Sequence, residues 1–231
     1  MKLFSRKLVD FIRATFSTND YIPLHAPIFG SKEKEYVLDA IDSTFVSTVG
    51  SYVTAFEKSV ARYTGSKFAI ATVNGTSALH SALIASKVQL NDEVITQSLT
   101  FVATSNAIRY CGAHPIFVDV AKDTMGMSPT SLMQFLYDFA ELRDDGLCWN
   151  KKTKRIIRAC IPVHCLGHPA EVDKIQELCD SYNIRLIEDS AESLGSFYKG
   201  RHTGSYGDSS IISFNGNKII TCGGGGMVLT N

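Results

Sequence analysis

Two residues suited to catalysis close apolar segments near the end of the sequence. Asp189 ends the segment 184–189, and Lys218 ends the later segment 213–218. If both segments belong to buried parallel strands, the carboxylate and the amine meet at the carboxyl edge of a sheet, where open α/β sheets bind ligands. Such a pair suits pyridoxal phosphate, which needs a lysine amine for covalent attachment and a carboxylate that keeps its ring nitrogen protonated. The pattern therefore predicts a cofactor site at this edge.

A third feature, Asn74-Gly75-Thr76-Ser77, lies between an apolar segment and an alanine-rich one. A strand that leads through such a turn into a helix presents backbone N–H groups and two hydroxyls to an anion, and the helix dipole favours negative charge there. The plainer alternative is an ordinary helix cap. The turn is not a GxxxxGK[ST] phosphate loop, and no GxGxxG fingerprint follows the first strand, which argues against a Rossmann dehydrogenase.

Each of these signals also has an ordinary structural explanation. Asp189 could cap a helix or occupy a surface turn, and Lys218 could be a solvated lysine at the end of a strand. Residues 223–226 are four glycines, which permit close backbone approach but also suit a flexible hairpin. Only together do the signals place an anion cradle, an acid and an amine at the ends of strands.

Strand and helix patterns alternate along the chain. Strands are expected at 68–73, 94–96, 115–120, 156–163, 184–189, 211–214 and 227–230. Helices are expected at 31–45, 52–63, 76–86, 102–110, from 128 onward, and at 170–182. Residues 141–155 are polar, which predicts an irregular surface connection. The alternation predicts a single α/β domain with a mostly parallel sheet covered on both faces.

The composition is that of an ordinary globular protein, with 231 residues, 45% hydrophobic, 20% charged, and a formal net charge of +0. This neutral balance gives no electrostatic case for nucleic acid or an anionic membrane as a partner. No apolar run approaches the roughly 20 residues that a membrane span needs. Residues 1–20 carry apolar positions at helical spacing, which predicts an amphipathic helix that packs on the domain or contacts a second copy.

The six cysteines follow no disulfide-framework spacing, and several lie in apolar segments, which predicts reduced thiols in a cytoplasmic protein. Cys160, His164, Cys165 and His168 are metal-ligand types, but their spacing matches no tetrahedral zinc template, so no metal site is expected. Residues 204–207 miss the nucleophile-elbow spacing, which argues against a serine hydrolase.

Several segments share their order and spacing with a known family. They are 73–79 (VNGTSAL), 98–104 (SLTFVAT), 115–119 (PIFVD), 187–191 (IEDSA), 198–201 (YKGR), 207–208 (GD) and 213–218 (SFNGNK). From about Ile22 to its last residue the chain resembles the DegT/DnrJ/EryC1/StrS sugar aminotransferases, which have the fold-type I pyridoxal-phosphate architecture. Residues 215–218 with their four following glycines, Glu192 and residues 42–50 look most like the branch that serves bacillosamine and legionaminic-acid synthesis.

The resemblance implies roles for the matching residues. Two would do the chemistry, since Lys218 would bind pyridoxal phosphate covalently and Asp189 would partner its ring nitrogen. The others would hold the cofactor by stacking on the ring (Phe101), by binding the phosphate (Thr76, Ser77 and Ser213) or by lying near the ring hydroxyl or the sugar (Glu192). Because many relatives have Gln or His at the position of Glu192, no catalytic role is assigned to it.

The resemblance also implies a fold and a reaction. Residues 21–231 would form a three-layer fold-type I aminotransferase large domain, without the small domain that relatives have beyond the position of Asn231. The expected reaction moves an amino group from an amino-acid donor such as glutamate to a nucleotide-linked 4-keto-6-deoxy sugar, in a homodimer. A sugar dehydratase with the same cofactor fits less well, since those enzymes have histidine where Lys218 stands. The alternative is a non-catalytic relative that binds the cofactor or a partner subunit.

Overall fold

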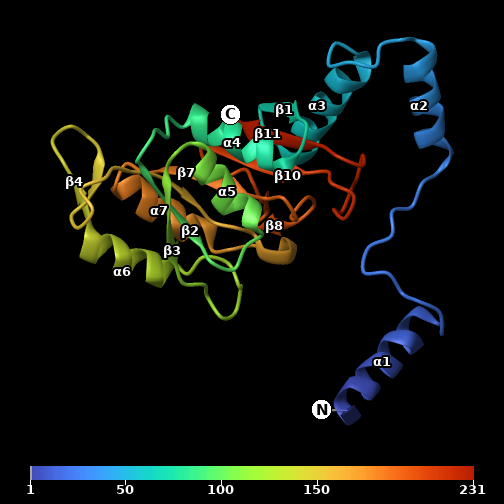
Figure 1. Ribbon diagram of the computed structural model, residues 1–231, viewed down its shortest axis with the longest axis horizontal. Coiled ribbons are helices and arrows are strands. Elements are labelled where there is room, and N and C mark those ends of the chain that lie inside the picture. The colour runs from blue at the N-terminus through green and yellow to red at the C-terminus, as the bar shows by residue number, and fades with distance from the viewer. Residues whose placement is uncertain (1) are drawn as a thin grey trace.

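A seven-stranded sheet organises the chain in the computed structural model, which describes residues 2–231 (Figure 1). Six strands run in the same direction, and β11 runs antiparallel to both of its neighbours, β1 and β10. The strands lie in the order β1 (Phe68–Thr72), β11 (Gly226–Thr230), β10 (Ser209–Ser213), β7 (Arg185–Asp189), β6 (Ile157–Ile161), β2 (Glu93–Gln97) and β3 (His114–Val118). The prediction of a mostly parallel α/β sheet is confirmed.

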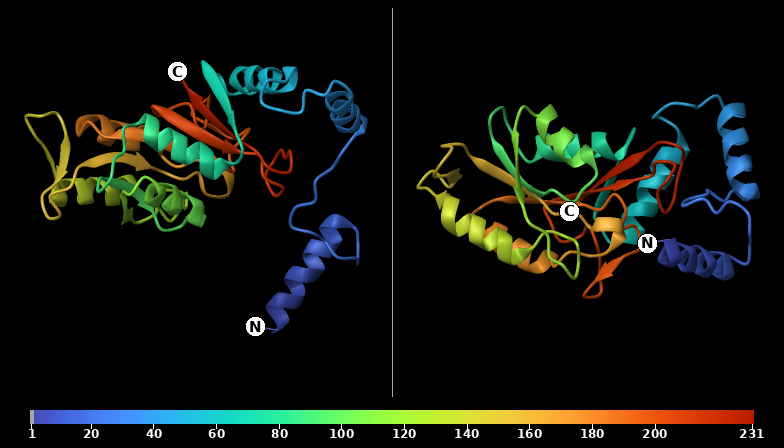
Figure 2. Two further views of the ribbon diagram at one scale, coloured as in Figure 1. Left: turned by 45° about the horizontal axis from the view of Figure 1, so that its top comes forward. Right: turned by 60° about the horizontal axis from the view of Figure 1, so that its bottom comes forward.

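Helices cover both faces of the sheet, which gives three layers (Figures 1 and 2). Ile187 and Ile211 face α4 (Gly75–Ala85) and α5 (Val102–Tyr110) in one buried cluster. Their sequence neighbours Leu186 and Ile212 face the other side, because successive residues of a strand point to opposite faces. That side is covered by α3 (Ser51–Thr64), α6 (Pro129–Phe139) and α7 (Val172–Ser181). The three-layer prediction is confirmed.

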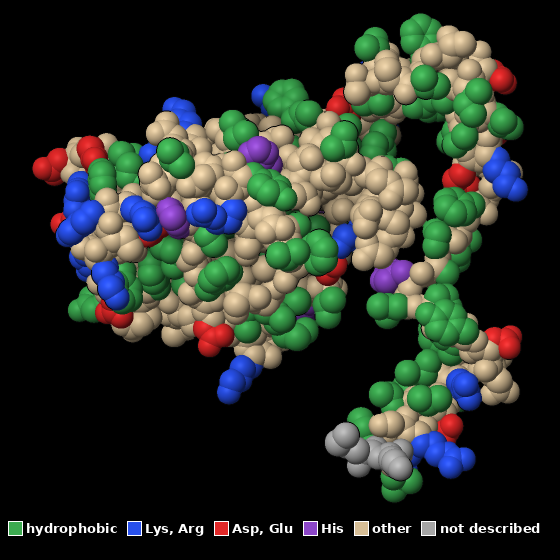
Figure 3. All heavy atoms as spheres, in the orientation of Figure 1, with side chains coloured by type: hydrophobic (Ala, Val, Ile, Leu, Met, Phe, Trp, Pro, Cys, Tyr) green, Lys and Arg blue, Asp and Glu red, His purple; other side chains and the backbone are tan. Residues whose placement is uncertain are grey.

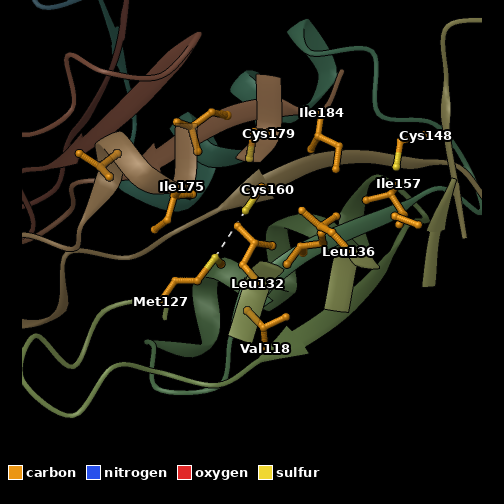
Figure 4. Close-up of a cluster of buried hydrophobic side chains, with 14 of the residues drawn as sticks. Val118, Met127, Leu132, Leu136, Cys148, Ile157, Cys160, Ile175, Cys179 and Ile184 are labelled. Atoms are coloured by element: carbon orange, nitrogen blue, oxygen red, sulfur yellow. Dashed lines mark hydrogen bonds between the residues drawn. The ribbon is translucent and has the colours of Figure 1, made fainter. Parts of the chain in front are cut away.

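Sulfur atoms contribute to the core between the sheet and helices α6 and α7 (Figure 4). Cys160 Sγ lies 3.5 Å from Met127 Sδ, and Cys148 and Cys179 are buried in the same cluster. Burial raises the pKa of Cys148 to about 12. Since all six cysteines are free thiols and three are fully enclosed, those three act as small hydrophobic residues, as the sequence predicted.

A hairpin replaces part of the irregular connection predicted at 141–155. Strands β4 (Ala140–Leu142) and β5 (Cys148–Asn150) pair antiparallel around a turn at Gly146, whose φ of 74° suits glycine. The Arg143 guanidinium stacks 4.6 Å from the centre of the Trp149 ring. The prediction was wrong here because the two strands have only three residues each, too few to show a period-two pattern in the sequence. The remaining short elements are η1 (Cys165–Gly167), β8 (Phe197–Tyr198) and β9 (Arg201–His202).

The N-terminal part of the chain projects away from the sheet (Figures 1 and 3). Helix α1 (Lys2–Phe16) matches the predicted amphipathic helix, yet Phe4 and Phe11 are 73% and 68% exposed. Helix α2 (Ser31–Asp42) has no buried residue and meets α3 through Tyr52, whose hydroxyl donates to Asp39 at 2.7 Å. No helix within residues 2–231 is long and apolar enough to cross a membrane. The apolar side chains of α1 thus find no cover within the described chain.

The last of the four glycines lets two segments meet closely at the carboxyl edge. Gly226 pairs with Thr72 of β1 and with Ser213 of β10. A Cβ atom on Gly226 would lie 2.4 Å from the backbone of Asn74. Since backbone atoms cannot yield as a side-chain tip can, this glycine fixes the turn before α4 against the start of β11.

We expect Gly226→Ala to lower the free energy of unfolding by about 1–3 kcal/mol, the usual effect of overpacking. Gly224→Ala is the matched control, because Gly224 is exposed and its nearest contact for a Cβ is 3.8 Å away. The control should stay within about 0.5 kcal/mol of the parent. Urea unfolding of the three proteins measures both effects, and equal stabilities for all of them would contradict the role of Gly226.

Candidate functional site

A cavity of about 520 Å³ opens where the parallel strands end. Its wall is built from the turn before α4, the start of α5 and the segments that follow β6, β7 and β10. Six of the seven predicted site residues line it: Thr76, Phe101, Asp189, Glu192, Ser213 and Lys218. The topology therefore brings the predicted acid, amine and anion cradle together, since β7 and β10 are parallel neighbours.

Ser77 is the predicted residue that does not line the cavity. It follows Thr76 on the first turn of α4, and its backbone N–H donates to Asn74 Oδ1 at 2.8 Å. Asn74 therefore caps the helix, as the plainer alternative for this motif expected. The cap and the cradle coexist, because Gly75 and Thr76 at the start of α4 still form part of the cavity wall.

Lys218 lies in a turn after β10 and not at the end of the strand, which closes five residues earlier at Ser213. Its Nζ atom donates to Glu192 Oε1 at 2.8 Å. The lysine side chain is 12% exposed and that of Glu192 is 37% exposed. The pair places an amine and a carboxylate side by side on the cavity wall. The sequence did not predict this contact between Glu192 and Lys218.

Asp189 is a buried acid at the end of β7, only 4% exposed. Its Oδ2 accepts a hydrogen bond from the Thr104 hydroxyl at 2.7 Å, and its Oδ1 accepts one from the Ala191 N–H at 3.2 Å. Burial raises the pKa of Asp189, against the lowering effect of these donors and of the charge of Lys218. Within residues 2–231 no cationic side chain forms an ion pair with Asp189, since Lys218 pairs with Glu192. The carboxylate therefore lacks a cationic partner at the cavity wall.

The preceding residue, Glu188, has the opposite environment. Its side chain is fully buried on the other face of the sheet and accepts from His164 Nε2 at 3.0 Å. Three backbone N–H groups also donate to it, from Gly204, Tyr206 and Gly207. Burial alone would raise the pKa of Glu188, but the interaction with His164 and the N–H donors hold it below its usual range.

His164 connects this network to the cavity. Its Nδ1 accepts the N–H of Ala170 at 3.1 Å, so the ring proton lies on Nε2 and is donated to Glu188. With both ring nitrogens engaged, His164 has none left for a metal. Its backbone N–H donates to the carbonyl of Asp189 at 3.1 Å, and the residue lines the cavity.

Sequence reasoning missed three residues of this site. Thr104 stands in the segment 98–104 that carries the family resemblance, and Glu188 precedes Asp189 in a buried strand. His164 drew notice only as a metal-ligand type. Two adjacent acids in one apolar strand were the available signal, because a buried acid needs partners from elsewhere in the chain.

A mostly parallel sheet that gathers a lysine, a buried acid and a helix start around one cavity defines the fold-type I aminotransferase class. The chain belongs to the DegT/DnrJ/EryC1/StrS aminotransferase family, whose sequence profile matches residues 27–231. Among solved structures it is similar to an aminotransferase from Psychrobacter cryohalolentis, with 34% identity and a TM-score of 0.79 over 92% of this chain and 49% of that one. It is also similar to the structure of DesI in the presence of its TDP-sugar product, with 32% sequence identity and a TM-score of 0.74 over 88% of this chain and 47% of that one.

Curated relatives agree with this assignment. The GDP-perosamine synthase of Escherichia coli O157:H7 is 44% identical over 211 residues, which is 91% of this chain and 53% of that protein. The putative pyridoxal phosphate-dependent aminotransferase EpsN of Bacillus subtilis is 41% identical over 210 residues, 91% of this chain and 51% of that protein. The chain thus spans about half the length of the curated relatives it matches.

The adjacent acids predict stability changes of opposite sign at pH 7. Glu188→Gln should lower the free energy of unfolding by about 2–4 kcal/mol, because an amide cannot satisfy all the donors around this position. Asp189→Asn should raise it, because the variant removes a buried charge that has no ion-pair partner. Urea unfolding of the cofactor-free chain measures both.

The pH dependence follows from the same shifts. The folded pKa of Glu188 is lowered, so its contribution is complete above the ordinary Glu value of about 4.3 and is lost only as pH falls further. The folded pKa of Asp189 is raised, so its unfavourable effect grows as pH rises. The gain from Asp189→Asn should therefore be smaller near the ordinary Asp value of about 3.9 than at pH 7. Changes of the same sign in both variants would contradict this account.

Proposed function

We propose that the chain is the cofactor-binding part of a pyridoxal-phosphate-dependent aminotransferase. The acceptor is a nucleotide-linked 4-keto-6-deoxy sugar, and the amino group comes from an amino acid, glutamate being the expected donor. The site of action is the cytoplasm, consistent with six free thiols. The names of its relatives support a nucleotide-sugar substrate, since three of them are GDP-perosamine synthases. The bacillosamine and legionaminic-acid branch stays a prediction.

The observation that carries this proposal is the buried carboxylate of Asp189 without an ion-pair partner. A carboxylate held out of water favours a cationic partner, and it faces a cavity that holds an amine and a helix start. A ligand with a protonated pyridine nitrogen, an aldehyde and a phosphate complements all three groups: the nitrogen pairs with the carboxylate, the aldehyde with the amine and the phosphate with the helix start. The residues present therefore fit pyridoxal phosphate.

Each wall of the cavity would hold a different part of the cofactor. Thr76 and Ser213 supply hydroxyl groups beside the start of α4, where the helix dipole favours the phosphate. We assign Ser77 to this group as well, through its hydroxyl, because its backbone N–H is already used by Asn74. The exposed ring of Phe101, at the start of α5, offers an apolar face for stacking.

When bound, pyridoxal phosphate supplies an electron sink for the carbon that loses or gains a proton. Asp189 would hold a proton on the ring nitrogen, because a desolvated carboxylate stabilises an adjacent positive charge. Lys218 Nζ would be the nucleophile that attaches the cofactor and the group that moves the substrate proton. Glu192 Oε1, 2.8 Å from that nitrogen, is a nearby acceptor for the proton that the amine must lose before it attacks.

We expect borohydride to fix pyridoxal phosphate on Lys218 alone. The nitrogen lies in the cavity and is 12% exposed, whereas Lys199 is 60% exposed and paired with Asp173 on the surface. The chain is incubated with the cofactor, reduced and digested, and the modified peptide is identified by mass spectrometry. Lys218→Arg is the control, because it keeps the charge beside Glu192 but forms no adduct. A label on another lysine, or none, would contradict the proposal and favour a non-catalytic binding protein.

We also propose that the protein is a homodimer and that helix α1 (Lys2–Phe16) contributes to the contact between the two copies. The apolar side chains of α1 are exposed in the single chain, with Phe4 at 73% and Phe11 at 68%. Sedimentation should show a dimer, and Phe4→Ser with Phe11→Ser should weaken it at least about tenfold. Lys7→Ser with Asp10→Ser is the control on the same helix. A monomer, or equal effects of both pairs, would contradict it.

A further inference from the structure

A line of hydroxyl groups leads from α5 to the buried acid. Thr104, 1% exposed, donates to Asp189 Oδ2 at 2.7 Å. The hydroxyl of Thr100 lies 2.7 Å from that of Thr104. Thr104 is therefore enclosed between a carboxylate and a second hydroxyl.

The number of hydroxyl hydrogens determines the direction of each hydrogen bond in this line. A threonine hydroxyl carries one hydrogen, and that of Thr104 goes to Asp189 when the acid is ionised. The short contact between the two hydroxyls then requires Thr100 to be the donor. Its alternative acceptor, the carbonyl of Phe101, is farther away at 3.2 Å. The order of donation is thus Thr100 to Thr104 to Asp189, and each bond polarises the next.

The same helical turn presents the ring-stacking residue and this donor. Phe101 caps α5, and its carbonyl accepts the N–H of Thr104 at 3.2 Å. Residues three apart on a helix lie on one side of it. The position of the Phe101 ring and the position of the Thr104 hydroxyl are therefore coupled through a single turn of backbone.

We propose that Thr104 is a positioning residue that fixes the rotation and basicity of the Asp189 carboxylate, with Thr100 supporting it. This inference rests on the proposed function, in which Asp189 partners the ring nitrogen. The other groups that act on the carboxylate are the Ala191 N–H, His164 and Lys218. Among the described residues, Thr104 is the side chain that donates a hydrogen bond to Asp189, so its loss leaves Oδ2 free to rotate.

The first test uses the chain without cofactor. The carboxyl carbon of Asp189 is followed by NMR across a pH titration, with Asp189→Asn to assign its signal. Thr104→Val should move the titration midpoint to higher pH, because the variant removes a donor that favours the charged form. Thr104→Ser should restore the parent midpoint, since it keeps the hydroxyl.

Thr96→Val is the matched control. Thr96 is fully buried on the adjacent part of the sheet, and its hydroxyl donates to the carbonyl of Ile161 at 2.9 Å, not to Asp189. The control removes the same hydroxyl from the core and should leave the midpoint of Asp189 unchanged. An equal movement in Thr104→Val and Thr96→Val, or none in Thr104→Val, would overturn the proposal.

Thr100→Val gives a second variant should Thr104→Val not fold. It removes the donor to Thr104 and should move the titration midpoint of Asp189 in the same direction by a smaller amount. An unchanged midpoint would overturn the supporting role of Thr100. If Thr104→Val does not fold, an unchanged midpoint in Thr100→Val would overturn the whole proposal. With cofactor bound, glutamate-dependent conversion should slow roughly tenfold in Thr104→Val and recover in Thr104→Ser. Failure of the parent chain to bind cofactor would refute the proposed function alone, because the titration of Asp189 in the cofactor-free chain still decides the role of Thr104.

Discussion

A buried carboxylate without an ion-pair partner is the constraint on which this site depends. Asp189 is 4% exposed, and burial raises its pKa, so the fold keeps a group that disfavours its own charged state. Two donors, Thr104 and the Ala191 N–H, offset part of this penalty. A cation that enters the cavity can offset the rest of this penalty. The site therefore favours ligands that carry a positive charge.

The strand that carries Asp189 is fixed by its neighbour in the sequence. Adjacent residues of β7 point to opposite faces, and a shift of one residue would exchange Glu188 and Asp189. Glu188 resists such a shift because its carboxylate accepts from His164 and from three backbone N–H groups of the segment 204–207. The hydrogen bonds on one face thus determine which acid reaches the cavity on the other.

Local pattern was enough to predict the parallel sheet, the helix start at residues 74–77 and the presence of Asp189 and Lys218 at one edge of the sheet, although Lys218 lies beyond the end of β10. These features depend on short-range periodicity and on the rule that parallel strands end at one edge. The network of Glu188 was beyond reach, because its partners lie up to 24 residues away along the chain and three of them are backbone groups. Thr104 was likewise invisible, since its bond to Asp189 joins residues 85 positions apart. The hairpin at 140–150 was missed because each of its strands is three residues long, which is too short for a period-two pattern to show in the sequence.

Three acids lie close together in sequence, and their surroundings separate them into three states. Glu188 is surrounded by donors and held ionised, while Asp189 has fewer donors and a raised pKa. Glu192 is 37% exposed and accepts a hydrogen bond from the Lys218 amine. Environments that differ in this way assign different tasks to one residue type. The first acid holds the strand, the second awaits a cation, and the third accepts from the amine, so one short segment supplies both the rigidity and the reactivity of the site.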